Sequence, residues 1–124
     1  QEEPRVICDV GHNAEGINHM VQQLAKESRG RLYLILGFMA DKDAKELLSM
    51  FPKDAEYLLT APTIPRALPI TDLSEMATEM GVKHDLFHQV RDAYSTALKS
   101  AGPGDTIFVG GSTFVVADLL TAIQ

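Results

Sequence analysis

The sequence predicts an α/β protein in which helices cover both faces of a mostly parallel sheet. Short apolar runs alternate along the 124 residues with segments whose apolar side chains repeat at the helical period. The runs lie far enough apart for a helix to cross between parallel strands, which favours right-handed βαβ units and a three-layer sandwich. No internal repeat or interdomain linker interrupts the pattern, so we expect a single domain over residues 1–124.

The first predicted strand is residues 5–9, a short apolar run bounded by breakers that reads as buried. The lone cysteine, Cys8, lies in this run, so we expect a buried structural thiol. From Asn13, the expected N-cap, the pattern becomes that of a helix that ends before Gly30. The apolar stripe of this helix consists of Ile17, Met20, Val21 and Leu24.

The middle of the chain predicts two strands with a helix between them. Residues 32–36 form a continuous apolar run typical of a strand covered on both faces, and residues 56–60 form the next strand. Asp43, with Glu46 three residues later, resembles a capping box. It opens a helix that Pro52 stops.

A loop at residues 61–69, which contains three prolines, separates this half of the chain from the rest. The next helix starts at Thr71 or Asp72, and Gly81 closes it. The remaining predicted elements are a candidate short strand at 82–87, a helix at 88–101, a strand at 106–109 and a helix that Ser112 or Thr113 opens.

The composition argues against several classes of protein. A formal net charge of −6 disfavours broad binding to nucleic acid or to anionic membranes, because such binding needs a basic surface. No apolar stretch approaches the ~20 residues of a membrane span, and no signal peptide is visible. We therefore expect a cytoplasmic protein with no nucleic-acid or membrane partner. Residues 1–4 contain no initiator Met, as in a piece of a longer chain or a protein with a removed tag.

Two strand-to-helix junctions form the candidate site, and we expect them to meet at one edge of the sheet. The carboxyl ends of parallel strands open into loops that feed helix N-termini, whose unpaired N–H groups attract anions. At the first junction, the Asp9 carboxylate is a candidate to accept hydrogen bonds from ribose hydroxyls or to orient a phosphate-bound cation. The alternative is that it hydrogen-bonds to its own loop backbone. His12 is a candidate to donate a hydrogen bond to a phosphate or to a developing charge. The alternative is an ordinary histidine in a turn, with no role in binding. Asn13 suits a helix cap as well as a ligand contact.

The second junction is residues 110–112, where two glycines precede Ser112 at a helix start. It permits close backbone approach and offers a hydroxyl to a carboxylate or phosphate, although a tight turn with an N-cap serine explains the same residues. Lys42, on the loop after the second strand, is a candidate anion contact or a charge at a helix start. Arg66, between prolines, is a cation for a carboxylate or a solvent-exposed loop residue.

Several catalytic and cofactor signatures do not occur in the printed sequence. No Gly-Lys-Ser/Thr follows the glycines, so there is no P-loop, and no Gly-x-Gly-x-x-Gly follows a strand. No Ser-His-Asp order with a nucleophile elbow is present. His84 and His88 stand without an acidic or cysteine set at ligand spacing, so we expect no metal site.

Four segments, taken together, resemble a known family. They are Asp9-Val10-Gly11-His12-Asn13, Gly37-Phe38-Met39-Ala40-Asp41-Lys42-Asp43, Pro65-Arg66-Ala67, and Gly111-Ser112 before an apolar helix. Their order and spacing are similar to the C-terminal domain of folylpolyglutamate synthase and the bifunctional dihydrofolate synthase, in the Mur ligase superfamily. The resemblance covers essentially the whole chain and implies a Rossmann-like fold.

The resemblance also implies ATP-dependent amide formation. In this family a folate or pteroate carboxylate is phosphorylated, L-glutamate attacks the acyl phosphate, and ADP and phosphate are released. The family's N-terminal domain holds the P-loop, the Mg²⁺ ligands and most of the folate site, while the C-terminal domain closes over ATP and the incoming glutamate. The implied partners are ATP, Mg²⁺, L-glutamate, folate or dihydropteroate, and the protein's own N-terminal domain.

Carried over position by position, the resemblance implies that Asp9 and Asn13 bind ATP. His12 would lie near the nucleotide or the reacting groups and is the implied catalytic residue. Ser112 and Arg66 would contact glutamate.

Two departures and two alternatives accompany the resemblance. Ala14 stands where the family often has a proline, and a Pro-Gly-Arg motif that touches ATP would precede residue 1. We therefore expect the isolated domain to fold but to perform no catalysis. The alternatives are a stand-alone nucleotide- or anion-binding module and the C-terminal domain of another Mur-type peptide ligase.

Overall fold

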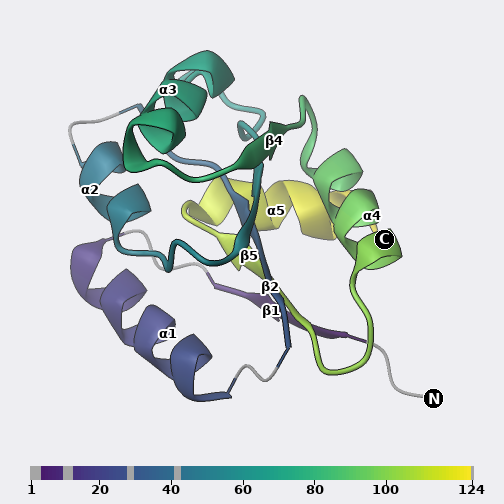
Figure 1. Ribbon diagram of the computed structural model, residues 1–124. Helices are drawn as coiled ribbons and strands as arrows, with labels where there is room; N and C mark the ends of the chain where they lie inside the picture. The colour runs from purple at the N-terminus through teal and green to yellow at the C-terminus, as the bar shows by residue number, and fades with distance from the viewer. Residues whose placement is uncertain (1–3, 10–12, 28–29, 41–42, 124) are drawn as a thin grey trace.

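The computed structural model, which describes residues 4–9, 13–27, 30–40 and 43–123, has five parallel strands in one sheet (Figure 1). The strands are Arg5–Cys8 (β1), Leu32–Leu36 (β2), Glu56–Leu59 (β3), His84–Leu86 (β4) and Thr106–Gly110 (β5). Their order across the sheet is β1-β5-β2-β3-β4, and every pair is parallel. The last strand of the chain is thus inserted between the first and the second.

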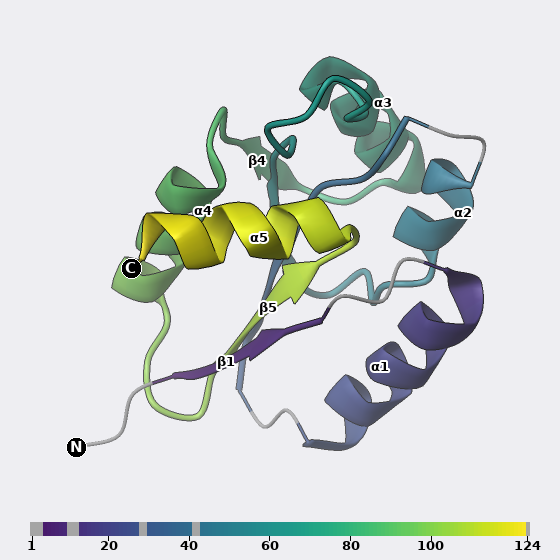
Figure 2. The same ribbon diagram turned by 180° about the vertical axis from the view of Figure 1, so that it is seen from behind.

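Helices alternate with the strands and form two outer layers, as the apolar pattern predicts. They are Ala14–Glu27 (α1), Ala44–Ser49 (α2), Ile70–Met80 (α3), Val90–Ser100 (α4) and Thr113–Ala122 (α5). Figures 1 and 2 show α1, α2 and α3 on one face of the sheet and α4 and α5 on the other. The predicted three-layer α/β fold class is therefore confirmed. No described helix is long and apolar enough to cross a membrane.

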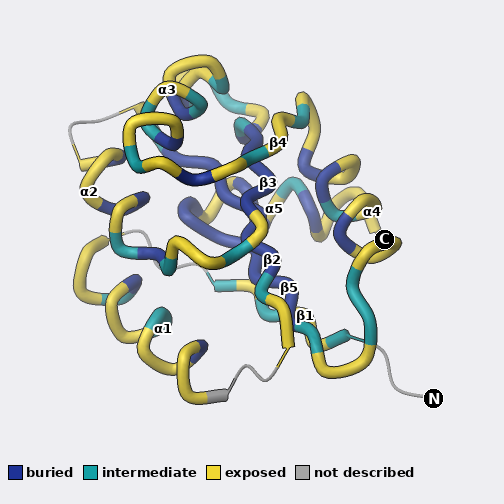
Figure 3. The backbone as a smooth tube through the Cα atoms, viewed as in Figure 1, coloured by how far each residue is buried: buried dark blue, intermediate teal, exposed yellow. Residues whose placement is uncertain are grey.

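Each face of the sheet carries its own core, because successive side chains of a strand point to opposite faces. Under α1–α3 the buried side chains include Leu34, Leu36, Leu59 and Phe108. Under α4 and α5 they include Ile35, Leu58, Ile107 and Val109. Figure 3 shows both cores as the dark centre of the molecule. The central strands β2, β3 and β5 are consequently buried on both sides, as expected for residues 32–36.

The first strand differs from its prediction. β1 lies at the edge of the sheet, where only Ile7 packs against the core under α1–α3. Val6 is 38% exposed, and Cys8 is exposed as well. The expectation of a buried strand with a buried thiol was therefore wrong, because the apolar run does not reveal that one face of an edge strand lacks a covering helix.

The helix ends confirm some predicted caps and correct others. Asn13 caps α1, with its Oδ1 accepting from the Gly16 N–H at 2.9 Å, and Gly81 closes α3 at φ +78°. Asp43 makes no side-chain capping hydrogen bond, so the predicted capping box is not formed. α3 starts earlier than expected, at Ile70, because Pro69 takes the N-cap position with a non-helical ψ of 141°.

Candidate functional site

The carboxyl edge of the sheet carries the candidate site. Because β1 pairs with β5 and β5 with β2, the segments that follow these strands emerge side by side. The Asp9 N–H donates to Val109 O at 3.0 Å, and the Gly37 N–H donates to Gly110 O at 3.4 Å. The expectation that the first and last junctions share one edge is therefore confirmed.

Asp9 and Asn13 flank the first junction. Asp9 is half-buried, and no described side chain or N–H bonds to its carboxylate. Asn13 is exposed, and its Oδ1 is used as the cap of α1, while no described residue accepts a hydrogen bond from its amide NH₂. Next to Asp9, partial burial raises the pKa of the Cys8 thiol, although the residue as a whole is exposed. The thiol is therefore protonated near neutral pH and a poor nucleophile.

The second junction is held by close contact between two loops. Gly111 has φ +91°, and a Cβ at this position would lie 2.7 Å from Gly37 O. The glycines therefore allow the chain to approach its own backbone, which is the tight-turn interpretation of this motif. Ser112 is only 1% exposed, and its Oγ accepts the Phe114 N–H at 3.1 Å as the N-cap of α5. No described residue accepts its hydroxyl hydrogen.

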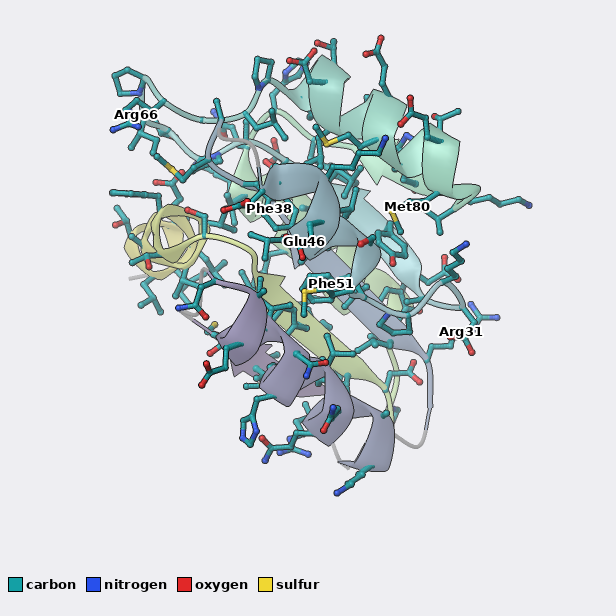
Figure 4. All side chains as sticks on the ribbon, turned by 90° about the vertical axis from the view of Figure 1, so that its left-hand side faces the viewer. Arg31, Phe38, Glu46, Phe51, Arg66 and Met80 are labelled. Atoms are coloured by element: carbon teal, nitrogen blue, oxygen red, sulfur yellow. The ribbon has the colours of Figure 1, made fainter. Side chains whose placement is uncertain are left out.

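Arg66 lies on a third segment at the same edge, after β3. Residues 38–40 and 66–68 form a short antiparallel ribbon in which the Ala40 N–H donates to Arg66 O and the Leu68 N–H to Phe38 O, both at 2.8 Å. The Thr63 N–H also donates to Asp118 Oδ2 of α5 at 2.7 Å. Figure 4 shows the Arg66 side chain at the rim of the molecule, far from Arg31 at the amino edge.

Two predicted site residues, His12 and Lys42, lie outside the described residues. Asp9, Asn13, Ser112 and Arg66 all belong to the carboxyl edge, on three segments that follow β1, β5 and β3. Among the residues that the structure describes, no group of three or more His, Cys, Asp or Glu side chains could hold a metal ion. His84 instead forms a 2.8 Å hydrogen bond with Ser74 Oγ and a 3.1 Å contact with Val82 O, which explains it as a structural residue.

Two hollows border these residues, and a third lies at the opposite edge of the sheet. A pocket of about 430 Å³ is lined by Met39, Ile64, Pro65, Arg66 and Phe114 at the carboxyl edge. A shallow hollow of about 510 Å³ adjoins Asn13, Glu15, Gly16 and His19. The largest, about 540 Å³, lies at the amino edge beside Tyr57 and His84. We assign it no part in the candidate site, because open α/β sheets bind ligands beyond the carboxyl ends of their strands.

The sequence did not single out Met39 and Phe114 as site residues. Phe114 is 44% exposed although α5 is strongly apolar, because it lies off the stripe formed by Val115, Val116 and Leu119. Its helical phase relative to those three residues was a usable signal. Met39 had no such signal, since its position depends on the ribbon with residues 66–68.

Comparison with known proteins agrees with this geometry. The family model described as "Mur ligase, glutamate ligase domain" matches residues 1–113. The dihydrofolate synthase/folylpolyglutamate synthase of Escherichia coli K12 is 30% identical over 99% of this chain, which corresponds to 29% of that protein. The folylpolyglutamate synthase of Lacticaseibacillus casei is 28% identical over 92% of this chain and 26% of its own length. The chain thus spans less than a third of these relatives.

Solved structures show the same fold. The bifunctional folylpolyglutamate synthase/dihydrofolate synthase of Yersinia pestis, complexed with AMPPNP and a Mn ion, superposes with a TM-score of 0.88 at 27% identity. The match covers 99% of this chain and 29% of that one. A structure of such an enzyme with Mn, AMPPNP and L-glutamate bound gives a TM-score of 0.85 at 26% identity over 99% of this chain and 30% of the other.

Proposed function

Since this chain belongs to the Mur ligase family as its glutamate ligase domain, we propose that it forms half of the active site of an ATP-dependent ligase. The proposed reaction adds L-glutamate to folate or dihydropteroate through an acyl phosphate. The adjacency of β1 and β5 carries the proposal, because it brings the Asp9 and Ser112 junctions to one edge. The relatives of this chain are synthases of this kind, and a similar structure holds AMPPNP, Mn and L-glutamate.

The proposed roles follow from the chemistry of each group. Asp9 accepts hydrogen bonds from the ATP ribose, and its half-buried carboxylate has no described partner that would compete. Asn13 contacts the nucleotide through its amide NH₂, and His12 donates to the reacting groups. Ser112 donates its hydroxyl hydrogen to glutamate while accepting the Phe114 N–H.

Two cations and one metal complete the proposal. Arg66 pairs with a glutamate carboxylate and Lys42 with an anion. Mg²⁺ is assigned to the remainder of the ligase, as the family resemblance implies.

An open edge suits a reaction that must exclude water at a chosen moment. An acyl phosphate hydrolyses readily, so the site has to close before the intermediate forms. Dividing the contacts between two domains makes closure depend on the substrates. This chain alone is therefore expected to show neither ATP hydrolysis nor glutamate addition, and turnover by the purified 124-residue chain would contradict the divided site.

Steady-state kinetics of the full-length ligase test the two junctions. Asp9→Ala is expected to lower kcat/KM for ATP by at least about 10-fold through loss of charge-assisted hydrogen bonds, and Ser112→Ala is expected mainly to raise the KM for glutamate. The exposed residues Asp72 and Ser100 provide matched controls, as Asp72→Ala and Ser100→Ala. Unchanged kinetics of Asp9→Ala, with normal thermal unfolding, would remove Asp9 from the site. A raised KM for ATP alone in Ser112→Ala would reassign that serine.

A further inference from the structure

The hollow at the amino edge of the sheet has the size of a small-molecule site. Its volume of about 540 Å³ falls within the usual range for ligand pockets, roughly 300–1,000 Å³. It forms because α4 packs on β2 and β3 and leaves the same face of the short strand β4 open. We call it the Tyr33 hollow, after a residue of its floor. Asp9 and Ser112 follow the opposite ends of their strands, so the hollow takes no part in the proposed reaction.

The strand register gives the Tyr33 hollow an apolar floor and a charged rim. Tyr33 pairs with Glu56, and Leu58 pairs with Asp85, and residues paired across parallel strands point to the same face of the sheet. Tyr33 and Leu58 belong to the core under α4 and α5. Glu56 and Asp85 therefore stand over that core, on the side where the fully buried Ala97 of α4 closes the floor.

The hydroxyl of Tyr33 has no hydrogen-bond partner among the described residues, although the residue is only 4% exposed. Tyr57, by contrast, donates its hydroxyl to Pro52 O at 2.7 Å. The Tyr33 oxygen is not sealed off as Thr60 Oγ1 is, so it opens into the hollow that this side chain lines. A buried tyrosine hydroxyl normally finds a partner, because an unpaired one costs free energy. A molecule in the hollow would supply that partner.

Three charged side chains of the rim also lack partners in the described part of the chain. They are Glu56 at the start of β3, Lys83 just before β4, and Asp85 within β4, and none of them forms an ion pair or side-chain hydrogen bond with another described residue. An organic cation would leave Lys83 facing a like charge, and an organic anion would face two carboxylates. A ligand that carries both an ammonium group and a carboxylate uses all three rim charges.

The floor of the Tyr33 hollow restricts the rest of the ligand. Leu58 and Ala97 disfavour a charged side chain, because burying a charge against apolar walls costs free energy. The Tyr33 hydroxyl both donates and accepts, so it suits a side chain that ends in an uncharged polar group such as an amide. L-Glutamate fits less well, since its side-chain carboxylate would add negative charge to an acidic rim on a chain of net charge −6.

We propose that the Tyr33 hollow binds a free α-amino acid with an uncharged polar side chain. Its ammonium group contacts Glu56 and Asp85, and its carboxylate contacts Lys83. Its side chain lies over Leu58 and ends at the Tyr33 hydroxyl. The site goes beyond the proposed function, because such a ligand occupies the amino edge of the sheet while the carboxyl edge stays open to the substrates.

Ligand titration of the isotopically labelled 124-residue chain, followed by NMR, tests the proposal. The probes are L-glutamine, N-acetyl-L-glutamine, which lacks the ammonium group, and L-glutamate, whose side chain is charged. We expect saturable shifts of the Leu58 and Ala97 methyl groups and the Tyr33 ring with L-glutamine. The other two probes are expected to bind in the hollow at least about 3-fold more weakly, because each lacks a rim contact or adds a repelled charge.

Matched variants separate the hollow from general surface effects. Tyr33→Phe is expected to weaken binding of L-glutamine about 5-fold while leaving thermal stability unchanged, because the lost hydroxyl has no described partner. Tyr94→Phe, at a half-buried position of α4 outside the hollow, is its control. Lys83→Gln is expected to weaken binding about 3-fold, whereas Lys99→Gln, at an exposed position outside the hollow, leaves it unchanged.

Four results would overturn the proposal. They are the absence of saturable shifts at Leu58 and Ala97, equal binding of N-acetyl-L-glutamine or L-glutamate in the hollow, full binding by Tyr33→Phe, and tighter binding by Lys83→Gln. The last would assign the hollow to an organic cation. None of these results bears on the proposed ligase function, which turnover of the full-length protein tests at the other edge of the sheet.

Discussion

The side chain of Thr60 lies fully buried just after β3, and no described residue forms a hydrogen bond with its Oγ1. Its backbone N–H is satisfied by Leu36 O at 2.9 Å, so only the hydroxyl is left over. A buried hydroxyl without a partner costs free energy, whereas a methyl group in its place does not.

Thr60→Val is therefore expected to raise the free energy of unfolding by about 1 kcal/mol, because it removes the unpaired hydroxyl at nearly constant volume. Urea unfolding of the isolated chain measures the change. Thr96→Val, at an exposed position on α4, is the control and is expected to change little. A loss of stability in Thr60→Val would show that the hydroxyl has a partner in solution.

At the scale of elements, the junction between β5 and α5 brings three strand ends together. Gly111 combines a left-handed φ of +91° with a close approach to Gly37 O. Gly81, at the end of α3, has a similar φ of +78°, but a Cβ there would meet nothing within 4 Å. Alanine at Gly81 therefore adds backbone strain alone, whereas alanine at Gly111 adds both strain and a steric clash.

Gly111→Ala is expected to destabilise the chain clearly more than Gly81→Ala, for which strain alone costs roughly 1–2 kcal/mol. The difference between the two losses in the free energy of unfolding measures the cost of forcing apart the loops that follow β5 and β2. Thermal and urea unfolding of both variants measure it. Equal losses would mean that the loops move apart at no cost and that their contact is unimportant.

At the opposite edge, Asp105 joins the starts of three strands. Its Oδ2 accepts the Gly102 N–H and its Oδ1 accepts the Arg31 N–H, each at 2.8 Å, while its backbone O accepts the Arg5 N–H at 3.0 Å. The Gly102 and Arg31 backbone hydrogen bonds lower the pKa of this carboxyl. The stabilisation is therefore present above the unfolded-state pKa and is lost as pH falls through the lower folded-state pKa.

Asp105→Ala is expected to lower the free energy of unfolding by about 1 kcal/mol at pH 6–7 through loss of these hydrogen bonds. The gap to the wild-type chain should narrow below about pH 4, as the pH falls from the unfolded-state pKa of this carboxyl through its lower folded-state pKa. Urea unfolding at several pH values measures the gap, with the exposed Asp85→Ala as control. A gap that persists unchanged in acid would assign the effect to the turn and not to the carboxylate.

At the scale of the whole molecule, one sheet serves two cores. Tyr57 is buried in the core under α1–α3 and Tyr33 in the core under α4 and α5. Burial and the nearby Asp54 raise the pKa of Tyr57 to about 12, and its hydroxyl donates to Pro52 O at 2.7 Å. Because both cores share β2, β3 and β5, loss of either one should disrupt the other.

Leu48→Ala, on the buried face of α2, and Leu119→Ala, on the buried face of α5, are each expected to cost roughly 2–5 kcal/mol by leaving a cavity. Each should also shift the whole unfolding curve, because the layers fold as one cooperative unit. Circular dichroism and tyrosine fluorescence are expected to give coincident transitions. Separate transitions for the two probes would show that the layers unfold independently.

The short range of the relevant forces explains what could be predicted from the sequence. Element types and the caps at Asn13, Gly81 and Ser112 depend on neighbours within a few residues. The prediction of a capping box at Asp43 was wrong, because residue types at the right spacing do not ensure that the side-chain capping hydrogen bond forms. Of the candidate site, the two junctions were predictable, while Met39 and Phe114 were not singled out.

By itself, the sequence determined the alternation of strands and helices and the apolar faces, since periodicity and turn chemistry are local properties. Only the tertiary structure decided that β5 lies between β1 and β2, that Cys8 faces solvent, and that Met39, Arg66 and Phe114 share a pocket. Strand order and solvent coverage depend on which distant segments pack together. No local pattern carries that information, because the same apolar run suits an edge or a central strand.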